Sequence, residues 1–475
     1  MQILTPLPLG PRTAPNRIMF GPHVTNLGGD DRSLTARHVA YFERRAAGGC
    51  GTVVIEGASV HGSDWPYERA PLAERCPAGW RSVADACRPH GSLVIASLDH
   101  AGGQGSSAYN QAPLWAPSRV PETNTREVPK WMEPDDIEAV VDGFRHAAKL
   151  AAEADLDGVE INAGQHSLVR QFLSGLTNHR DDEWGQDRLL FARQVIGAAR
   201  DGAGADRIIG LRLSCDELAP WAGITPDMAP DIAHALTGAG VDYLVVTRGS
   251  IFSAEKTRPD FHEPTGFNIE VCRSVHAAVD VPVFLQGSIV DIGQAEWALG
   301  GFDEPPLCHG VEMTRAQIAD PDLVAKLSRD ERDRVRPCTR CNQTCQVRDA
   351  RNPIVTCIGE PSSGRETEDP DWYQPARTIR PVVVVGGGPG GLETARIAAI
   401  RGHDVSIVER DEQLGGVARF AGPHASLVDW YVRELDRLGV AVTLGVTWHA
   451  TAPGGGPGGG HGGGGPGGVY GGGGE

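Results

Sequence analysis

The sequence contains no apolar run long enough to cross a membrane, and basic side chains are fewer than acidic ones. A spanning helix needs roughly 18 consecutive apolar residues, and the start, MQILTPLPLG, lacks the basic and then apolar pattern of a signal peptide. Lys and Arg total 44 against 61 Asp and Glu, which gives a net charge of −17. Such a charge repels phosphate backbones and anionic lipid. We therefore expect a cytoplasmic protein with no nucleic-acid or membrane partner.

The ten cysteines are unevenly distributed along the 475 residues, and four of them fall in one short segment. Their spacing is Cys338-x2-Cys341-x3-Cys345-x11-Cys357, which offers four thiolates. Structural zinc usually takes two CxxC pairs or Cys together with His, whereas this segment has one CxxC. We therefore expect a [4Fe-4S] cluster on these four cysteines, with zinc as the alternative.

Short apolar runs rich in Val, Ile and Leu alternate with segments of helical periodicity in the first part of the chain. This alternation is typical of a parallel sheet whose strands are joined by helices, such as the helix predicted over Pro134–Glu153. Eight such units favour a closed (β/α)8 barrel, with an open doubly wound sheet as the alternative. The predicted strands are Ile18–Phe20, Thr52–Glu56, Leu93–Leu98, Gly158–Asn162, Ile208–Leu213, Tyr243–Val246, Val281–Gln286 and His309–Met313.

A second fold is predicted to begin at Val382, where VVVVGGGPGGLETARIAAIRGHDVSIVER reads as strand, glycine-rich turn, helix and strand. The turn has the form GxGxxG through Gly386, Gly388 and Gly391. Glu409 ends the next strand, where a carboxylate can accept ribose hydroxyls while the helix N-terminus faces a pyrophosphate. We interpret this as the opening of a Rossmann-like dinucleotide-binding domain, with a flexible turn as the alternative.

The predicted organisation ends in a glycine-rich tail, in which 16 of the 23 residues from Pro453 onward are glycine. Such a segment cannot bury apolar surface, so we expect it to be disordered. It follows Val440–Leu444, which resembles an internal strand, so the dinucleotide-binding domain is predicted to be truncated. The predicted parts are a barrel (1–335), a cluster segment (336–360), a linker (361–380), a partial Rossmann-like domain (381–450) and the tail (451–475).

Polar residues follow the fourth predicted strand, where a barrel enzyme holds catalytic groups. Asn162 and Gln165 can donate two neutral hydrogen bonds to one carbonyl oxygen, and His166 can supply a proton near neutral pH. The alternative is that these three are loop residues that satisfy backbone groups.

Two arginines and a pair of turns point to a bound anion in the barrel. Arg212 lies inside an apolar strand and needs an anionic or polar partner, for which a cofactor is a natural choice. Gly287 and Ser288 follow one late strand, and Thr314 and Arg315 follow the next. Small turns with a guanidinium are expected at the phosphate site of a barrel, and a structural salt bridge of Arg315 is the alternative.

Several segments together resemble one family: LTPLPLGPRTAPNRIMFGPHVTN, DGVEINAGQHSLVRQFLS, GLRLS, VEMTRAQIADPDL and the four cysteines. They are similar to the Old Yellow Enzyme-like iron-sulfur flavoproteins, the group that includes 2,4-dienoyl-CoA reductase and trimethylamine dehydrogenase. EINAGQHSLVRQFLSG looks most similar to members associated with the mycofactocin redox-peptide system.

The resemblance implies FMN in the barrel, a [4Fe-4S] cluster beside it, and FAD or ADP in the following domain. Electrons would then pass from NAD(P)H through FAD and the cluster to FMN. The resemblance also implies which residues surround FMN: Pro22, Thr25, Ala58, Arg212, Gly287, Ser288, Thr314 and Arg315, with Ser97 where relatives often place a glutamine near the flavin ring.

The chain departs from this family at several functional positions. Asn162 and Gln165 stand where many relatives have a histidine pair, and Ser167 stands at the usual position of a tyrosine proton donor. A histidine used by dienoyl-CoA reductases is replaced in the segment around Ser253, which disfavours that reaction. Relatives also continue for about another domain, so we expect the FAD site to be incomplete.

These observations predict an FMN- and [4Fe-4S]-dependent NAD(P)H:acceptor oxidoreductase. Hydride would pass between FMN N5 and a small enone- or quinone-like substrate, and a separate redox partner would be compatible with this scheme. The alternatives are a catalytically impaired, truncated electron-transfer protein of the same family and a zinc-dependent barrel hydrolase. No oligomeric state is predicted.

Overall fold

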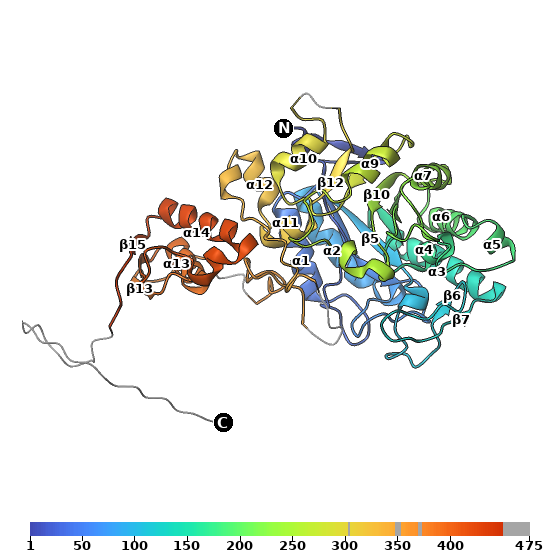
Figure 1. Ribbon diagram of the computed structural model, residues 1–475, viewed down its shortest axis with the longest axis horizontal. Coiled ribbons are helices and arrows are strands. Elements are labelled where there is room, and N and C mark those ends of the chain that lie inside the picture. Colours follow the sequence, from blue (N-terminus) through green and yellow to red (C-terminus); the bar gives the residue numbers. More distant parts are fainter. Residues whose placement is uncertain (303–304, 347–352, 369–372, 450–475) are drawn as a thin grey trace, which may run out of the picture.

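The protein folds into two connected units of unequal size (Figure 1). The computed structural model describes residues 1–302, 305–346, 353–368 and 373–449. The predicted disordered tail at 451–475 lies outside the described residues.

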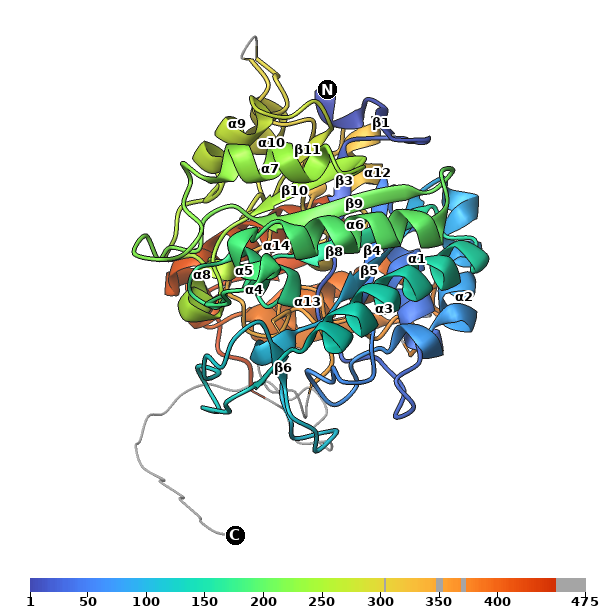
Figure 2. The same cartoon turned by 90° about the vertical axis from the view of Figure 1, so that its right-hand side faces the viewer.

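Eight parallel strands close into a barrel in the order β10-β11-β12-β3-β4-β5-β8-β9 (Figures 1 and 2). This confirms the predicted (β/α)8 fold and excludes the open-sheet alternative. The strands are β3 (Ile18–Phe20), β4 (Thr52–Ser59), β5 (Leu93–Asp99), β8 (Gly158–Ala163), β9 (Ile208–Ser214), β10 (Tyr243–Thr247), β11 (Val283–Leu285) and β12 (Gly310–Glu312).

Helices between the strands cover the outside of the barrel (Figure 2). The helix predicted over Pro134–Glu153 has those bounds as α3, and its apolar stripe of Ile137, Val140 and Phe144 is buried. The helices of this unit are α1 (Ala36–Ala47), α2 (Pro77–Cys87), α3 (Pro134–Glu153), α4 (Leu168–Leu173), α5 (Glu183–Gln186), α6 (Leu190–Ala203), α7 (Ala229–Thr237), α8 (Ala254–Thr257), α9 (Ile269–His276), α10 (Ile292–Ala298), α11 (Thr314–Ala319) and α12 (Leu323–Ser328).

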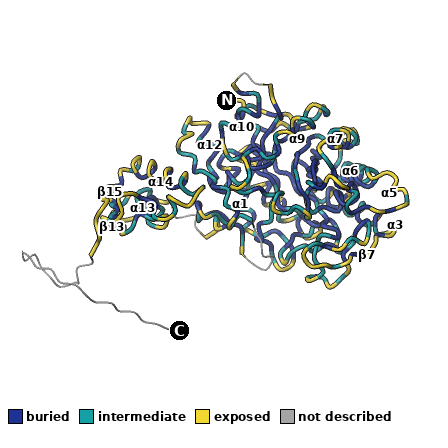
Figure 3. Tube along the Cα trace, in the orientation of Figure 1, coloured by how far each residue is buried: buried dark blue, intermediate teal, exposed yellow. Residues whose placement is uncertain are grey.

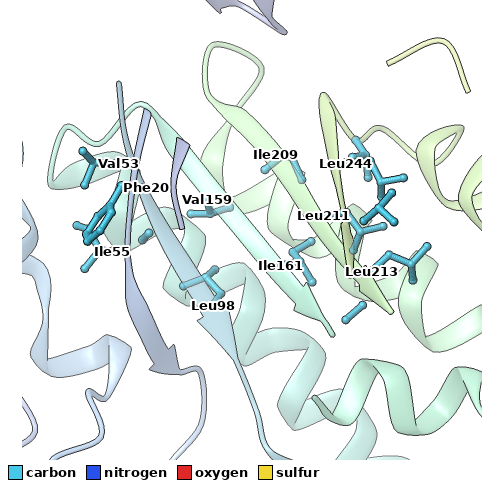
Figure 4. Close-up of a cluster of buried hydrophobic side chains, with 14 of the residues drawn as sticks. Phe20, Val53, Ile55, Leu98, Val159, Ile161, Ile209, Leu211, Leu213 and Leu244 are labelled. Carbon is cyan, nitrogen blue, oxygen red and sulfur yellow. The ribbon is translucent and has the colours of Figure 1, made fainter. Parts of the chain in front are cut away.

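Successive strand residues enter two different apolar clusters, as the alternation of side chains in a strand requires. Val53 and Ile55 of β4 belong to the large cluster that includes the helices (Figure 4). Val54, between them, joins a smaller cluster with the hairpin β1 (Leu7–Leu9) and β2 (Arg12–Ala14). The short parallel pair β6 (Trp115–Ala116) and β7 (Lys130–Trp131) lies in the long connection after β5. The strands are thus buried on both faces, which leaves their ends to carry the polar groups.

The second unit is a parallel sheet with strand order β13-β14-β15. Its elements are β13 (Pro381–Val385), α13 (Pro389–Ile400), β14 (Asp404–Val408), α14 (Ala425–Arg437) and β15 (Ala441–Thr443). Counted from β15 to β13, the strands are the third, second and first along the chain. This is half of the usual dinucleotide-binding sheet, in which a fourth strand pairs with the first. Among the described residues β13 has no partner on that side. Val385, Val442 and Leu444 are exposed apolar residues of this sheet region, and Figure 3 shows exposed stretches of the trace near β13 and β15.

A buried arginine joins the two units. The Arg336 side chain donates to the Gly359 carbonyl and, at 2.7 Å, to Glu360 Oε2. Its guanidinium lies 4.5 Å from the ring centre of Trp430 in α14, and the Trp430 indole N–H donates to the Arg334 carbonyl at 3.0 Å. The helices of the second unit are therefore fixed to the segment that leaves the barrel.

Within the described ranges, none of the helices combines the length and the apolar character that crossing a membrane requires.

Candidate active site

A cavity of about 370 Å³ is surrounded by residues that follow the barrel strands. Its size falls within the roughly 300–1,000 Å³ of typical cofactor and ligand pockets. Most of the predicted site residues of the barrel line it: Pro22, Ser97, Asn162, Gln165, His166, Arg212, Gly287, Ser288, Thr314 and Arg315, together with Cys345 of the cluster segment. Thr25 and Ala58 are buried and are not among the lining residues.

The two predicted carbonyl-binding amides each have one N–H bond committed within the protein. Asn162 Nδ2 donates to Asp99 Oδ2 at 2.8 Å, while its Oδ1 accepts from the Gly164 N–H. Gln165 Nε2 donates to the Thr257 carbonyl at 2.9 Å. A side-chain amide carries two N–H bonds, so each residue retains one donor, and both side chains border the cavity.

His166 borders the cavity as a neutral imidazole. Burial, followed by the nearby positive charges of Arg258 and Arg170, lowers the pKa of His166 to about 3. The expectation that His166 supplies a proton near neutral pH is therefore not supported by its surroundings.

Ser167, at the position of the usual tyrosine donor, does not line the cavity. Its hydroxyl accepts from the Val169 N–H at 3.0 Å and donates to the Asn162 carbonyl, so it caps α4. Strand β8 and the turn that follows it thus provide hydrogen-bond donors and no evident source of a proton.

Arg212 has protein partners on both sides. Its Nε donates to Glu160 Oε1 at 2.8 Å and its Nη2 to Glu312 Oε2 at 2.6 Å. Burial alone would lower the pKa of Arg212, but the two carboxylates raise it above its ordinary value. The sequence pointed to a cofactor as the natural partner and missed both carboxylates. Glu160 lies on the neighbouring strand β8, and Glu312 lies on β12, which is remote from β9 in the sequence. The guanidinium still borders the cavity.

The turn after β11 and the start of α11 meet at one side of the cavity. Arg315 donates to Ser288 Oγ, to the Pro259 carbonyl at 2.9 Å and to Asn342 Oδ1 at 2.7 Å. Thr314 Oγ1 accepts from the Gly21 N–H at 2.8 Å. These contacts bring together the residues of the predicted phosphate site.

Sequence reasoning missed several polar groups of the cavity, among them His23, Glu56 and Asp99. Glu56 accepts from the Thr25 N–H and from the Tyr67 hydroxyl, both at 2.7 Å, and lies 3.0 Å from His38 Nε2. This network holds Thr25 behind the cavity wall. Asp99 is the last residue of β5, so the rule that barrel strands end in functional residues could have identified it.

The four clustered cysteines are unpaired and partly exposed. Backbone N–H groups approach two of the sulfurs at 3.4 Å, from Arg340 to Cys338 and from Gly359 to Cys357. Burial is the main cause that raises the pKa of Cys345 to about 11. The negative charges of Cys338 and Cys341 raise it further, which shows that the three cysteines lie near one another. In the part of the chain that is described, no three His, Cys, Asp or Glu side chains form a group that could hold a metal ion.

The predicted dinucleotide loop has the required backbone geometry. Gly386 has φ of +101°, and an added Cβ at Gly391 would lie 2.0 Å from the Gly386 carbonyl oxygen. The Glu409 carboxylate accepts from the N–H groups of Gly387 and Asp411. Gly388 precedes α13 as its N-cap, so the loop leads from β13 into a helix N-terminus as predicted.

A (β/α)8 barrel with a polar cavity at its strand ends, followed by half of a dinucleotide-binding sheet, defines a class of two-unit barrel oxidoreductases. The chain belongs to the NADH:flavin oxidoreductase / NADH oxidase family, which it matches over residues 2–334. Residues 350–456 match the pyridine nucleotide-disulphide oxidoreductases. These matches confirm the resemblance to Old Yellow Enzyme-like proteins, whereas the mycofactocin association stays a prediction.

Relatives share both units. The chain is 34% identical to N,N-dimethylglycine/sarcosine dehydrogenase of Chromohalobacter salexigens, over 93% of this chain and 66% of that protein. It is 31% identical to NADH oxidase of Thermoanaerobacter brockii, over 91% and 68%. A solved structure of 2-naphthoyl-CoA reductase, 26% identical, superposes with a TM-score of 0.88 over 94% of this chain and 70% of that one. The chain thus spans about two thirds of the length of these relatives.

Proposed function

We propose that the protein is an FMN- and [4Fe-4S]-dependent NAD(P)H:acceptor oxidoreductase that reduces a small enone- or quinone-like substrate. The observation that carries this proposal is the cavity of about 370 Å³. It is bordered by the side-chain amides of Asn162 and Gln165, each of which retains one N–H donor, and by Arg315 and Cys345. Bound FMN would supply hydride chemistry at its N5 atom. The residues present suit it, because the cavity has the required size, polar donors and a guanidinium for the phosphate.

In this proposal the protein positions and polarises the substrate. The free N–H bonds of Asn162 and Gln165 hold the substrate's carbonyl oxygen, and two neutral donors stabilise charge on that oxygen without titrating. Ser288, Thr314 and Arg315 bind the flavin phosphate. The Arg212 guanidinium, held by two carboxylates, keeps a fixed positive group beside the flavin.

The four cysteines would hold the cluster, which supplies one-electron transfer next to the cavity. Their N–H···S contacts suit it, because hydrogen bonds to sulfur tune such clusters. The cluster is favoured over zinc, since a cubane spreads its thiolates over several irons, whereas zinc requires all four ligands around one ion. Cys345 lines the cavity as well, so the cluster would lie beside the flavin.

The second unit would bind FAD through Gly386, Gly388 and Gly391 and through Glu409, with NAD(P)H as the electron donor. Half of the usual sheet is described, and we propose that a redox partner can also supply electrons. The cytoplasmic location, the absence of nucleic-acid and membrane partners, and the domain boundaries stay predictions.

The test is an anaerobic absorption spectrum with flavin, iron and acid-labile sulfide analysis, followed by mixing the dithionite-reduced protein with 2-cyclohexenone or a benzoquinone. We expect one FMN and about four irons per chain, and rapid reoxidation of the flavin by the organic acceptor. Zinc without visible absorbance would contradict the proposal and favour a barrel hydrolase.

A second candidate is a catalytically impaired electron-transfer protein of the same family. The sheet of the smaller unit, with three described strands and exposed apolar residues, favours it, because this is half of the sheet that binds a dinucleotide. This candidate predicts a reduced flavin that no organic acceptor reoxidises.

A further inference from the structure

The cavity needs a source of protons that strand β8 does not provide. Burial lowers the pKa of His23 to about 4 and that of His166 to about 3, so both imidazoles are neutral at pH 7. Burial raises the pKa of Tyr67 well above its ordinary range. Asp99 differs from these three groups, because burial and then the negative charge of Asp64 raise its pKa to about 7.

The position of Asp99 suits proton transfer to a bound substrate. The carboxyl group ends β5, borders the cavity and is partly exposed to it. Its Oδ2 accepts from Asn162 Nδ2 and its Oδ1 from the His100 N–H, both at 2.8 Å. Each oxygen retains a lone pair that can carry a proton. Asn162 therefore places the carboxyl next to the point where its second N–H bond would hold a substrate.

We propose that Asp99 is the general acid–base residue of this site. The inference rests on the proposed function, because it assigns the proton that reduction of an enone requires. The hydride that adds to the β-carbon of the substrate, as the carbon–carbon double bond opens, would come from bound reduced flavin. The Asp99 carboxyl gives its proton to the α-carbon and becomes a carboxylate, which solvent then protonates. In the reverse direction the carboxylate takes that proton back.

Several groups around Asp99 set the pH at which it acts. Asp64 and Tyr67 face it from the loop after β4, His100 follows it in sequence, and Asn162 faces it from β8. His61 lies further out, linked to His100 through Ser63. In the described ranges no ion pair joins Asp99 to Lys or Arg, so the charge of Asp64 is the main influence that a substitution can remove. An Asp64→Asn change should lower the pH at which Asp99 loses its proton.

The kinetic test follows flavin reoxidation by 2-cyclohexenone in the reduced holoprotein from pH 5 to pH 9. The wild-type rate should fall as pH rises through about 7. Asp99→Asn should slow the reaction by about 10²-fold, the usual contribution of a general acid, and should remove this pH dependence. Asp99→Glu should restore part of the rate, and Asp64→Asn should move the midpoint to lower pH. The exposed Asp231→Asn on α7 is the control and should change neither quantity.

A spectroscopic test does not depend on turnover. Infrared difference spectra of the holoprotein between pH 5 and pH 9 should contain a carboxyl band that titrates near pH 7 and is absent from Asp99→Asn. A variant that keeps the wild-type rate and pH profile would overturn the role of Asp99, and so would a titrating band that survives the substitution. A wild-type protein that reduces neither enone nor quinone would instead overturn the proposed function, and the role of Asp99 with it.

Discussion

Gly287 lies where the backbone turns from β11 toward the predicted phosphate site. Its φ is +114°, and an added Cβ would lie 2.7 Å from Asn268 Cγ. Gly287→Ala should therefore destabilise the fold by about 1–3 kcal/mol and reduce the amount of bound FMN. Urea denaturation and flavin content measure the two effects. Gly197→Ala in α6 is the control, because open space surrounds it and alanine should stabilise a helix by about 0.5–1 kcal/mol.

His23 should make the protein sensitive to acid. Its Nδ1 lies 2.9 Å from the Gly21 carbonyl and its Nε2 2.8 Å from the Tyr41 hydroxyl, and burial lowers its pKa from 6.5 to about 4. His23 binds a proton below pH 6.5 in the unfolded chain but only below about pH 4 in the folded chain. The free energy of unfolding therefore falls as the pH decreases through this window. At about 1.4 kcal/mol per pH unit, the loss is about 3 kcal/mol.

Urea denaturation between pH 7 and pH 4 measures this loss. His23→Gln should remove about 3 kcal/mol of the decline, although its stability at pH 7 should be lower. The decline caused by His166 and His309, whose pKa values burial lowers to about 3 and about 4, should remain. An equally steep decline in the variant would show that other groups cause it.

The residues of the cavity show what could be predicted from sequence. Asn162, Arg212 and Arg315 lie at the cavity as expected, because their positions at strand ends or within a strand are local features. Their partners could not be predicted in the same way. Arg212 pairs with Glu160 of the adjacent strand β8 and with Glu312 of β12, three strands away around the barrel, so the second contact depends on how the sheet closes.

Among the elements, helix α4 depends on a cap that also contacts a residue of the site. Ser167 Oγ accepts from the Val169 N–H at 3.0 Å, and loss of such a cap costs about 1 kcal/mol. Ser167→Ala should therefore lower the melting temperature by a few degrees and slow the reaction, since Ser167 also holds the Asn162 carbonyl. Asp136→Ala is the control, because it removes a bond to the Glu133 N–H at the start of α3, where no residue lines the cavity, and it should lower stability without slowing the reaction.

The ends of the strands were harder to predict than their existence. Strand β4 continues three residues beyond the predicted end at Glu56, because a bulge between Ile55 and Ala58 restores its pairing with β5. Conversely, β11 is shorter than predicted and spans Val283–Leu285. Apolar runs indicate where a strand is buried, but hydrogen bonds to its neighbours decide where it ends.

In the whole molecule, Arg336 should determine how firmly the two units are connected. Its partners Glu360 and Glu393 come from opposite sides of the junction, and it is almost fully buried. Arg336→Ala would leave the buried Glu360 carboxylate without its arginine partner, which typically costs about 3–5 kcal/mol, while Glu393 would keep its pair with Arg396. We expect faster limited proteolysis between residues 360 and 380. Arg365→Ala, which breaks an exposed pair with Glu368, should leave the digestion rate unchanged.

Among the described residues one side of β13 has no partner strand, and we expect this to make the association of the protein depend on its concentration. Backbone N–H and C=O groups along Pro381–Val385 can pair with a strand from another molecule, and burial of the neighbouring apolar side chains would stabilise such pairing. Self-association should therefore grow with concentration through the smaller unit alone. The mean molecular mass measured over a dilution series should fall to that of a single chain while the barrel stays folded. The size and solubility of the protein would then be set by one short strand rather than by the barrel.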